Sequence, residues 1–71
     1  MYILVFVYHD GSPKEYYGGG TYIVGGEKYA VITQREKAKR FKSRKVAENA
    51  YKKLLLSCAN VEEGFEIEEA D

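Results

Sequence analysis

The chain has little of the chemistry from which active sites and metal centres are built. Its 71 residues include one cysteine, one histidine and no tryptophan. His9 stands 49 residues before Cys58, and neither residue has the spacing of a metal site. No pair of acidic and basic groups follows a recognisable catalytic motif. We therefore predict no catalytic residue, no metal and no cofactor, and a protein without enzymatic activity.

The lone thiol and the lack of long hydrophobic runs bear on where the protein works. A single cysteine excludes an internal disulfide framework and is typical of a reducing compartment. The apolar run 2–8 is too short to span a membrane, and no basic stretch precedes it as in a signal peptide. These features predict a cytoplasmic protein without membrane contacts. With 45% hydrophobic residues, the chain predicts one packed domain, 1–71, near the lower size limit for independent folding.

Charge is zero overall but is sorted along the sequence. Segment 1–27 carries a net charge of −2, segment 28–53 carries +8, and segment 54–71 carries −6. Such asymmetry indicates either an anionic partner or neutralisation of the basic middle by the acidic tail. A solvated surface that compensates itself is the alternative.

Segment 41–58 carries a sustained helical period. Ser43 is a suitable N-cap, and Asn60 is a candidate left-handed stop after the last turn. Leu56 projects onto the polar side, as a stray surface residue, as part of a protein-binding face, or under the acidic tail. Cys58 is expected in the core, because a buried cysteine behaves as a small hydrophobe. At about 100° per residue, one side of the helix holds Val46, Ala47, Ala50, Tyr51, Leu54 and Cys58.

The first part of the chain predicts β-structure. Residues 1–8 are β-branched and aromatic, and they are apolar on both faces, which indicates a central strand. A turn at 9–13 leads to a short returning strand at 14–17. The glycines at 18–20 favour a structural bend, because they lack the spacing and the Lys-Ser/Thr of a phosphate-binding loop.

The remaining segments complete an α+β domain. Residues 21–24 and 28–32 flank Gly25-Gly26 and predict a hairpin. Residues 33–36 match a capping box with Thr33 at the cap and predict a short helix. Residues 65–68 alternate apolar and acidic side chains, which predicts an edge strand. The order is β-β-β-short α-α-β, a small antiparallel sheet with one long helix packed on one face.

One helix covers one face of a sheet, so the other face is a candidate interface with a partner or a second copy. The alternative is that loops such as the glycine segments fold over it. Tyrosine is favoured at interfaces because it contributes a large area at low entropic cost. The candidate partner-binding residues are Tyr2, Leu4, Phe6 and Tyr8, or the alternate side chains of that strand, with Tyr16, Tyr17 and Leu56.

A band of cations forms a second candidate surface. Lys/Arg density of this kind neutralises phosphates, so the band predicts nucleic-acid binding, with a solvated face as the alternative. A small anionic ligand at the glycine-rich loops is a third possibility. The band consists of Arg35, Lys37, Lys39, Arg40, Lys42, Arg44, Lys45 and Lys52.

Ala38, Phe41, Ser43, Ala47 and, one place late, Leu54 follow an Ala-x-x-Phe-x-Ser-x-x-x-Ala-x-x-x-x-x-Leu pattern after the glycine-rich hairpin, and 65–69 closes the chain. In this the chain resembles small proteins that are common in phage and prophage genomes. The resemblance implies a mobile-element accessory protein in the bacterial cytoplasm. It also implies binding to a host protein or nucleoprotein, in a class where inhibitors of host defence are frequent.

Residues 43–50, Ser-Arg-Lys-Val-Ala-Glu-Asn-Ala, are similar to the Ser-Lys-Lys-x-Ala-Lys-x-x-Ala start of the last helix in double-stranded-RNA-binding domains. In that family a three-stranded sheet precedes the helix, and its lysines reach phosphates across a groove. Glu48 stands where the family has a lysine, and an acidic strand follows the helix here. The resemblance implies nucleic-acid binding as the alternative function.

Overall fold

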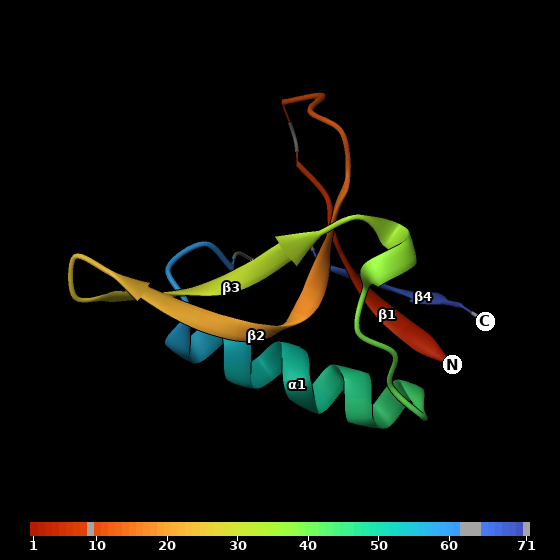
Figure 1. The fold of residues 1–71 in the computed structure, drawn as a ribbon. Helices are drawn as coiled ribbons and strands as arrows, with labels where there is room; N and C mark the ends of the chain where they lie inside the picture. The colour runs from red at the N-terminus through yellow and green to blue at the C-terminus, as the bar shows by residue number, and fades with distance from the viewer. Residues whose placement is uncertain (9, 62–64, 71) are drawn as a thin grey trace.

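The computed structural model describes residues 1–8, 10–61 and 65–70. A four-stranded antiparallel sheet in the order β3-β2-β1-β4 and one long helix form a small α+β fold, as predicted. Along the chain the elements are β1 (Tyr2–Phe6), β2 (Glu15–Val24), β3 (Glu27–Thr33), a 3₁₀ turn η1 (Arg35–Lys37), α1 (Arg44–Ser57) and β4 (Glu66–Glu69) (Figure 1).

Strand β1 lies inside the sheet, and both of its faces are buried. Leu4 and Phe6 point toward α1 and share a core with Leu54. Ile3 and Val5 point the other way, where Ala38 and Ala70 cover them. The prediction of an uncovered sheet face along this strand is therefore wrong. The cover comes from the segment after η1 and from the end of β4, and not from the glycine loops.

The two sequence segments 14–17 and 21–24 form one strand, β2, and not two. The glycines lie at an irregularity in the β2–β3 register between Tyr17 and Thr21, which confirms the predicted bend. Gly19 has a φ of +94°, and a Cβ built on it would lie 3.0 Å from the Lys39 side chain. Glycine is needed here because of both the backbone conformation and the close neighbour. The predicted Gly25-Gly26 hairpin turn is confirmed, with φ values of 58° and 83°.

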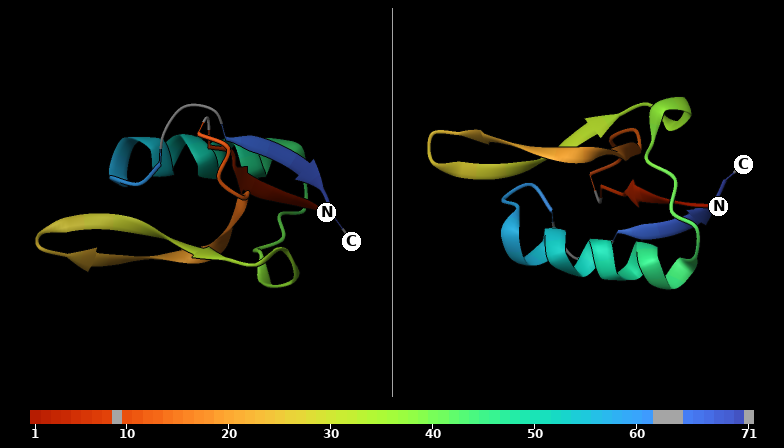
Figure 2. Two further views of the ribbon diagram at one scale, coloured as in Figure 1. Left: turned by 90° about the horizontal axis from the view of Figure 1, so that it is seen from above. Right: turned by 60° about the horizontal axis from the view of Figure 1, so that its bottom comes forward.

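Segment 38–41 fills the gap where β1 and β2 diverge. Phe41 exchanges two backbone hydrogen bonds with Tyr2, with N···O distances of 2.9 and 2.8 Å. The Lys39 amide donates to the Tyr17 carbonyl at 2.9 Å. Basic residues are thereby fixed at the end of the molecule where the chain begins (Figure 2).

The long helix follows its prediction closely. Ser43 caps it by accepting a hydrogen bond from the Val46 amide at 3.2 Å. Ala47, Leu54 and Cys58 are buried as expected, but Val46 is 50% exposed because it lies at the margin of the apolar stripe. The capping box is wrong, because η1 begins after Gln34 and has no side-chain cap.

Asn60 has a different role from the left-handed stop that the sequence predicts. No described residue other than glycine has a positive φ. The Asn60 side chain instead accepts a hydrogen bond from the Ala30 amide at 2.8 Å and donates one to the Ala30 carbonyl at 3.0 Å. The Ala59 amide adds a bond to the Lys28 carbonyl at 2.8 Å. Together these bonds attach the end of α1 to the outer edge of β3.

Candidate functional site

The predicted partner-binding residues do not form one surface. Leu4 and Phe6 are 0% and 2% exposed and belong to the core. Tyr2 is half-buried, with the Arg44 guanidinium 5.5 Å from its ring centre. Tyr17 is buried beside Phe41, and this burial raises its pKa. Tyr16 is half-buried on the other face of the sheet, beside Ile3 and Val5. Tyr8 and Leu56 are exposed.

Exposed apolar side chains gather instead at the outer half of the β2–β3 hairpin, which projects beyond the end of α1 (Figure 1). We call Tyr22, Ile23, Val24 and Leu56 the hairpin end; they are 49%, 69%, 58% and 89% exposed. The signal in the sequence was the apolar run before Gly25-Gly26, which reads equally well as a core strand. Only the length of the hairpin relative to the helix shows that this run lies outside the core.

Both faces of the hairpin carry cross-strand pairs near its turn. The rings of Tyr22 and Tyr29 stack with their centres 5.6 Å apart on one face. The Tyr29 hydroxyl donates to a Glu27 carboxylate oxygen at 2.9 Å, and this hydrogen bond raises the pKa of Tyr29. Ile23 lies opposite Lys28 on the other face. These pairs order the hairpin end without burying it.

A hollow of about 410 Å³ lies between the hairpin turn and the end of α1. Leu56 stands at this hollow, so it belongs to the same end of the molecule as the hairpin turn. The hydrogen bonds of Ala59 and Asn60 to β3 hold the two parts of this surface together. The lining residues are Gly26, Glu27, Lys28, Leu56, Ser57, Cys58 and Ala59.

The predicted basic band occupies the opposite end, on η1, the following segment and the first turn of α1 (Figures 1 and 2). Lys52 lies about 10 Å farther along the helix from Lys45. The Lys39 ammonium lies 5.8 Å from the Phe41 ring centre, and Arg40 donates to the Ala38 carbonyl at 2.6 Å. Within the band, the exposed lysines without an ion pair to a described carboxylate are Lys37, Lys39, Lys42, Lys45 and Lys52.

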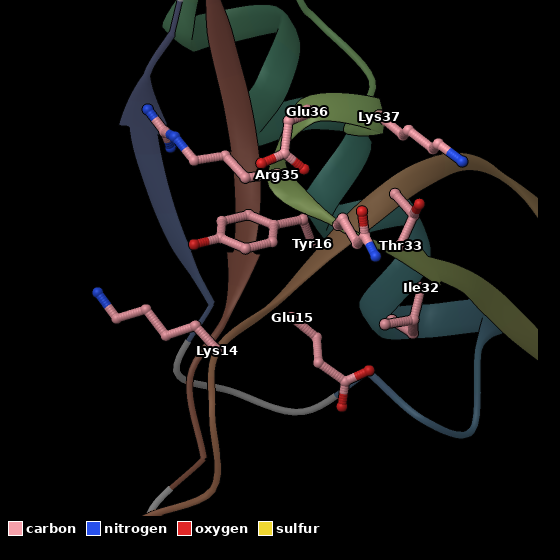
Figure 3. A pocket seen from close by; sticks show the side chains of 9 residues that line it. Lys14, Glu15, Tyr16, Ile32, Thr33, Arg35, Glu36 and Lys37 are labelled. Atoms are coloured by element: carbon pink, nitrogen blue, oxygen red, sulfur yellow. The ribbon is translucent and has the colours of Figure 1, made fainter.

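One glutamate of the acidic tail meets the basic band directly. A Glu68 carboxylate oxygen lies 3.0 Å from an Arg35 nitrogen, and the other lies 3.5 Å from Lys14 Nζ. Lys14, Tyr16 and Arg35 reach across β1 toward β4 beside an open hollow of about 590 Å³ (Figure 3). Lys14, Arg35 and Lys37 line this hollow together with Glu15 and Glu36, so its charge favours neither anions nor cations. Asp71 lies outside the described residues.

Two further features of the described residues concern metal sites and membrane-spanning helices. Among the described residues, no group of three or more His, Cys, Asp and Glu side chains is placed to hold a metal ion. Within the same residues, no helix has the length and hydrophobicity to cross a membrane. His9 lies outside the described part of the chain. Cys58 is buried.

Comparisons with known protein families, with curated proteins and with solved structures find no match for this chain. The surfaces of the molecule and the sequence resemblances are therefore the basis for a proposed function.

Proposed function

We propose that this chain is a non-enzymatic binding protein of the phage or prophage accessory type, and that its hairpin end binds a host protein. The observation that carries the proposal is the exposure of Ile23 on β2 and Leu56 on α1, at 69% and 89%, at the end of the molecule where Ala59 and Asn60 bond to β3. An ordered apolar surface at one end of a small protein is typical of a contact site. Inhibition of a host defence protein is one form that such binding takes.

The anchoring of the hairpin end matters because an ordered surface loses little conformational entropy on binding. Asn60 and Ala59 fix the helix end to β3, and the glycine turn closes the hairpin tightly. Tyr22 contributes a ring that is already held by stacking on Tyr29. A partner therefore meets preformed apolar side chains and not a loop that must fold first.

Affinity capture tests this proposal. The purified chain is immobilised and exposed to a nuclease-treated bacterial lysate, and retained proteins are quantified by mass spectrometry. We expect a protein that wild type retains and that Ile23→Asp/Leu56→Asp does not. The control is Asn49→Asp, on the exposed side of α1, which retains that protein fully. Equal retention by all three proteins contradicts the proposal.

A second candidate function is nucleic-acid binding by the basic band, favoured by the exposure of Lys37, Lys42 and Lys45 without a carboxylate partner among the described residues. The double-stranded-RNA-binding resemblance of segment 43–50 supports the same function. Binding of this kind weakens steeply as salt rises, with a slope of about −0.9 per neutralised phosphate on a log–log plot.

A gel-shift series at several salt concentrations tests the second candidate. We expect Lys42→Gln to lower the salt slope for duplex RNA by about one phosphate contact, or ~0.9. The matched control is Lys28→Gln at the hairpin turn, which leaves the slope unchanged. Absence of binding at low salt would show that the basic band is a solvated face.

A further inference from the structure

The outer edge of β4 is an open sheet edge. Strand β4 is the last in the order β3-β2-β1-β4 and pairs only with β1 among the described strands. Figure 2 shows it at the margin of the sheet, beside α1. The other margin is different, because Ala59 and Asn60 occupy hydrogen-bonding groups along β3.

The register shows which backbone groups are available. In an antiparallel pair, residues alternate between those that bond each other and those whose N–H and C=O groups point away. Tyr2 gives both of its groups to Phe41, on the side of β1 away from β4. Its opposite residue Glu69 must therefore direct its own groups away from β1, and Ile67, two residues earlier, does the same. Neither has a hydrogen-bond partner there among the described residues.

The side chains beside this edge define what fits it. Ile67 lies on the α1 side of β4 with Leu4 and packs against the same core as the half-buried Leu55 and the Tyr51–Phe65 ring pair. Glu66 and Glu68 lie on the opposite side, beside Val5 and Ile3. A strand that alternates apolar and basic residues places an apolar residue opposite Ile67 and cations opposite Glu66 and Glu68, while Glu69 lies on the Ile67 side. Because Glu68 already pairs with Arg35 and Lys14, Glu66 is the carboxylate that is available to a cation of the added strand.

A second copy of the chain does not match. Three of the four residues of β4 are glutamates, at positions Glu66, Glu68 and Glu69. When two copies of β4 pair in antiparallel orientation, glutamates from both strands face one another directly, which is destabilising. Charge complementarity therefore selects a basic partner strand over self-association.

We propose that the outer edge of β4 docks an extended basic segment of a partner protein, which adds antiparallel to β4 as a fifth strand. Backbone bonds to Ile67 and Glu69 hold the segment, and Glu66 selects its charge. This surface is separate from the hairpin end, so it stands or fails independently of the function proposed above.

The probe is the synthetic peptide acetyl-Lys-Val-Lys-Val-Lys-Val-Lys-amide, titrated into the isotope-labelled 71-residue chain and followed by NMR. We expect saturable shifts and slowed hydrogen exchange at the Ile67 and Glu69 amides. Antiparallel docking with valine opposite Ile67 uses the backbone groups of the valines. A peptide N-methylated at its valines should bind roughly four- to a hundredfold more weakly, because it loses the two bonds to the Ile67 and Glu69 carbonyls and each contributes roughly two- to tenfold. Methylation at the lysines should leave binding nearly unchanged.

Matched protein variants test the charge. Glu66→Gln should weaken binding severalfold at low salt, whereas Glu27→Gln, an exposed glutamate at the hairpin turn, should not. Equal binding of the two methylated peptides would show that charge alone attracts the peptide and would overturn the proposal. Shifts of the β4 amides with protein concentration alone would identify a second copy as the occupant and overturn it as well. Absence of any shift at β4 would do the same.

Discussion

Strand β1 and the outer half of the hairpin have similar apolar sequences, but β1 is buried and the outer hairpin is exposed. Tyr-Ile-Leu-Val-Phe forms β1, and Leu4 and Phe6 within it are 0% and 2% exposed. Tyr-Ile-Val ends β2, and Ile23 within it is 69% exposed. Position in the sheet decides the difference, because β1 has neighbours on both edges and cover on both faces. The outer hairpin extends past the helix and has no comparable cover among the described residues.

Apolar residues have two different roles in this small domain. Residues of β1 supply the buried area that holds a 71-residue chain together. Residues of the hairpin end add little to that area, so folding does not explain their hydrophobicity. An exposed apolar surface that the fold does not require is typical of a binding site for a partner.

A charged residue placed in each region should give the largest difference in stability between the two. Leu4→Asp buries an unpaired carboxylate and should destabilise the fold by more than about 4 kcal/mol, enough to unfold a domain of this size. Ile23→Asp should change stability by no more than about 0.5 kcal/mol, because the side chain stays in water. Urea denaturation followed by circular dichroism measures both. Comparable losses would show that the hairpin end belongs to the core.

Two leucines of α1 repeat the comparison within one helix. Leu54→Ala should lower stability by about 2–5 kcal/mol, because it truncates a buried side chain. Leu56→Ala should lower it by less than about 0.5 kcal/mol, since Leu56 is 89% exposed. Chemical denaturation of both variants measures the two losses of stability. Equal losses would place the apolar stripe of the helix on a different side.

The attachment of the hairpin to the helix end has an intermediate effect. Asn60→Ala leaves the Ala30 N–H and C=O without their partners and should cost about 1–3 kcal/mol. Hydrogen exchange of the Ala30 amide should also become faster than in wild type. Asn49→Ala, on the exposed side of α1, is the control and should not destabilise. Unchanged exchange at Ala30 would show that the Asn60 contact does not order the hairpin.

The smallest effect on stability concerns the charge sorting. Neutralising Glu66, Glu68 and Glu69 with glutamine should change stability by only about 0–1 kcal/mol, because the ion pairs of Glu68 are partly exposed. Weak, salt-sensitive binding to DNA or RNA should increase, since the acids no longer oppose the field of the basic band. Gel shifts at two salt concentrations and thermal melts test both statements. A large drop in melting temperature would contradict the first.

Local rules predicted the elements that local interactions determine. Ser43 caps α1 through a hydrogen bond from Val46, three residues later, and the Gly25-Gly26 turn needs no distant contact. The cover over Ile3 and Val5 was not predictable, because Ala38 and Ala70 lie more than thirty residues from β1 in the sequence, in the middle and at the end of the chain. Strand β1 is apolar on both faces, so its pattern gives no sign of which face meets the helix. Asn60 looked like a turn residue because its long-range partner Ala30 is visible only in three dimensions.

Photo-crosslinking from Ile23 tests whether the hairpin end contacts a partner. The photoreactive residue benzoylphenylalanine replaces Ile23 in the full chain, expressed in bacterial cells, and adducts are separated by mass after irradiation. We expect one discrete protein adduct from position 23 and none from position 49 on the exposed side of α1. No adduct from position 23, or the same adducts from both positions, would contradict it.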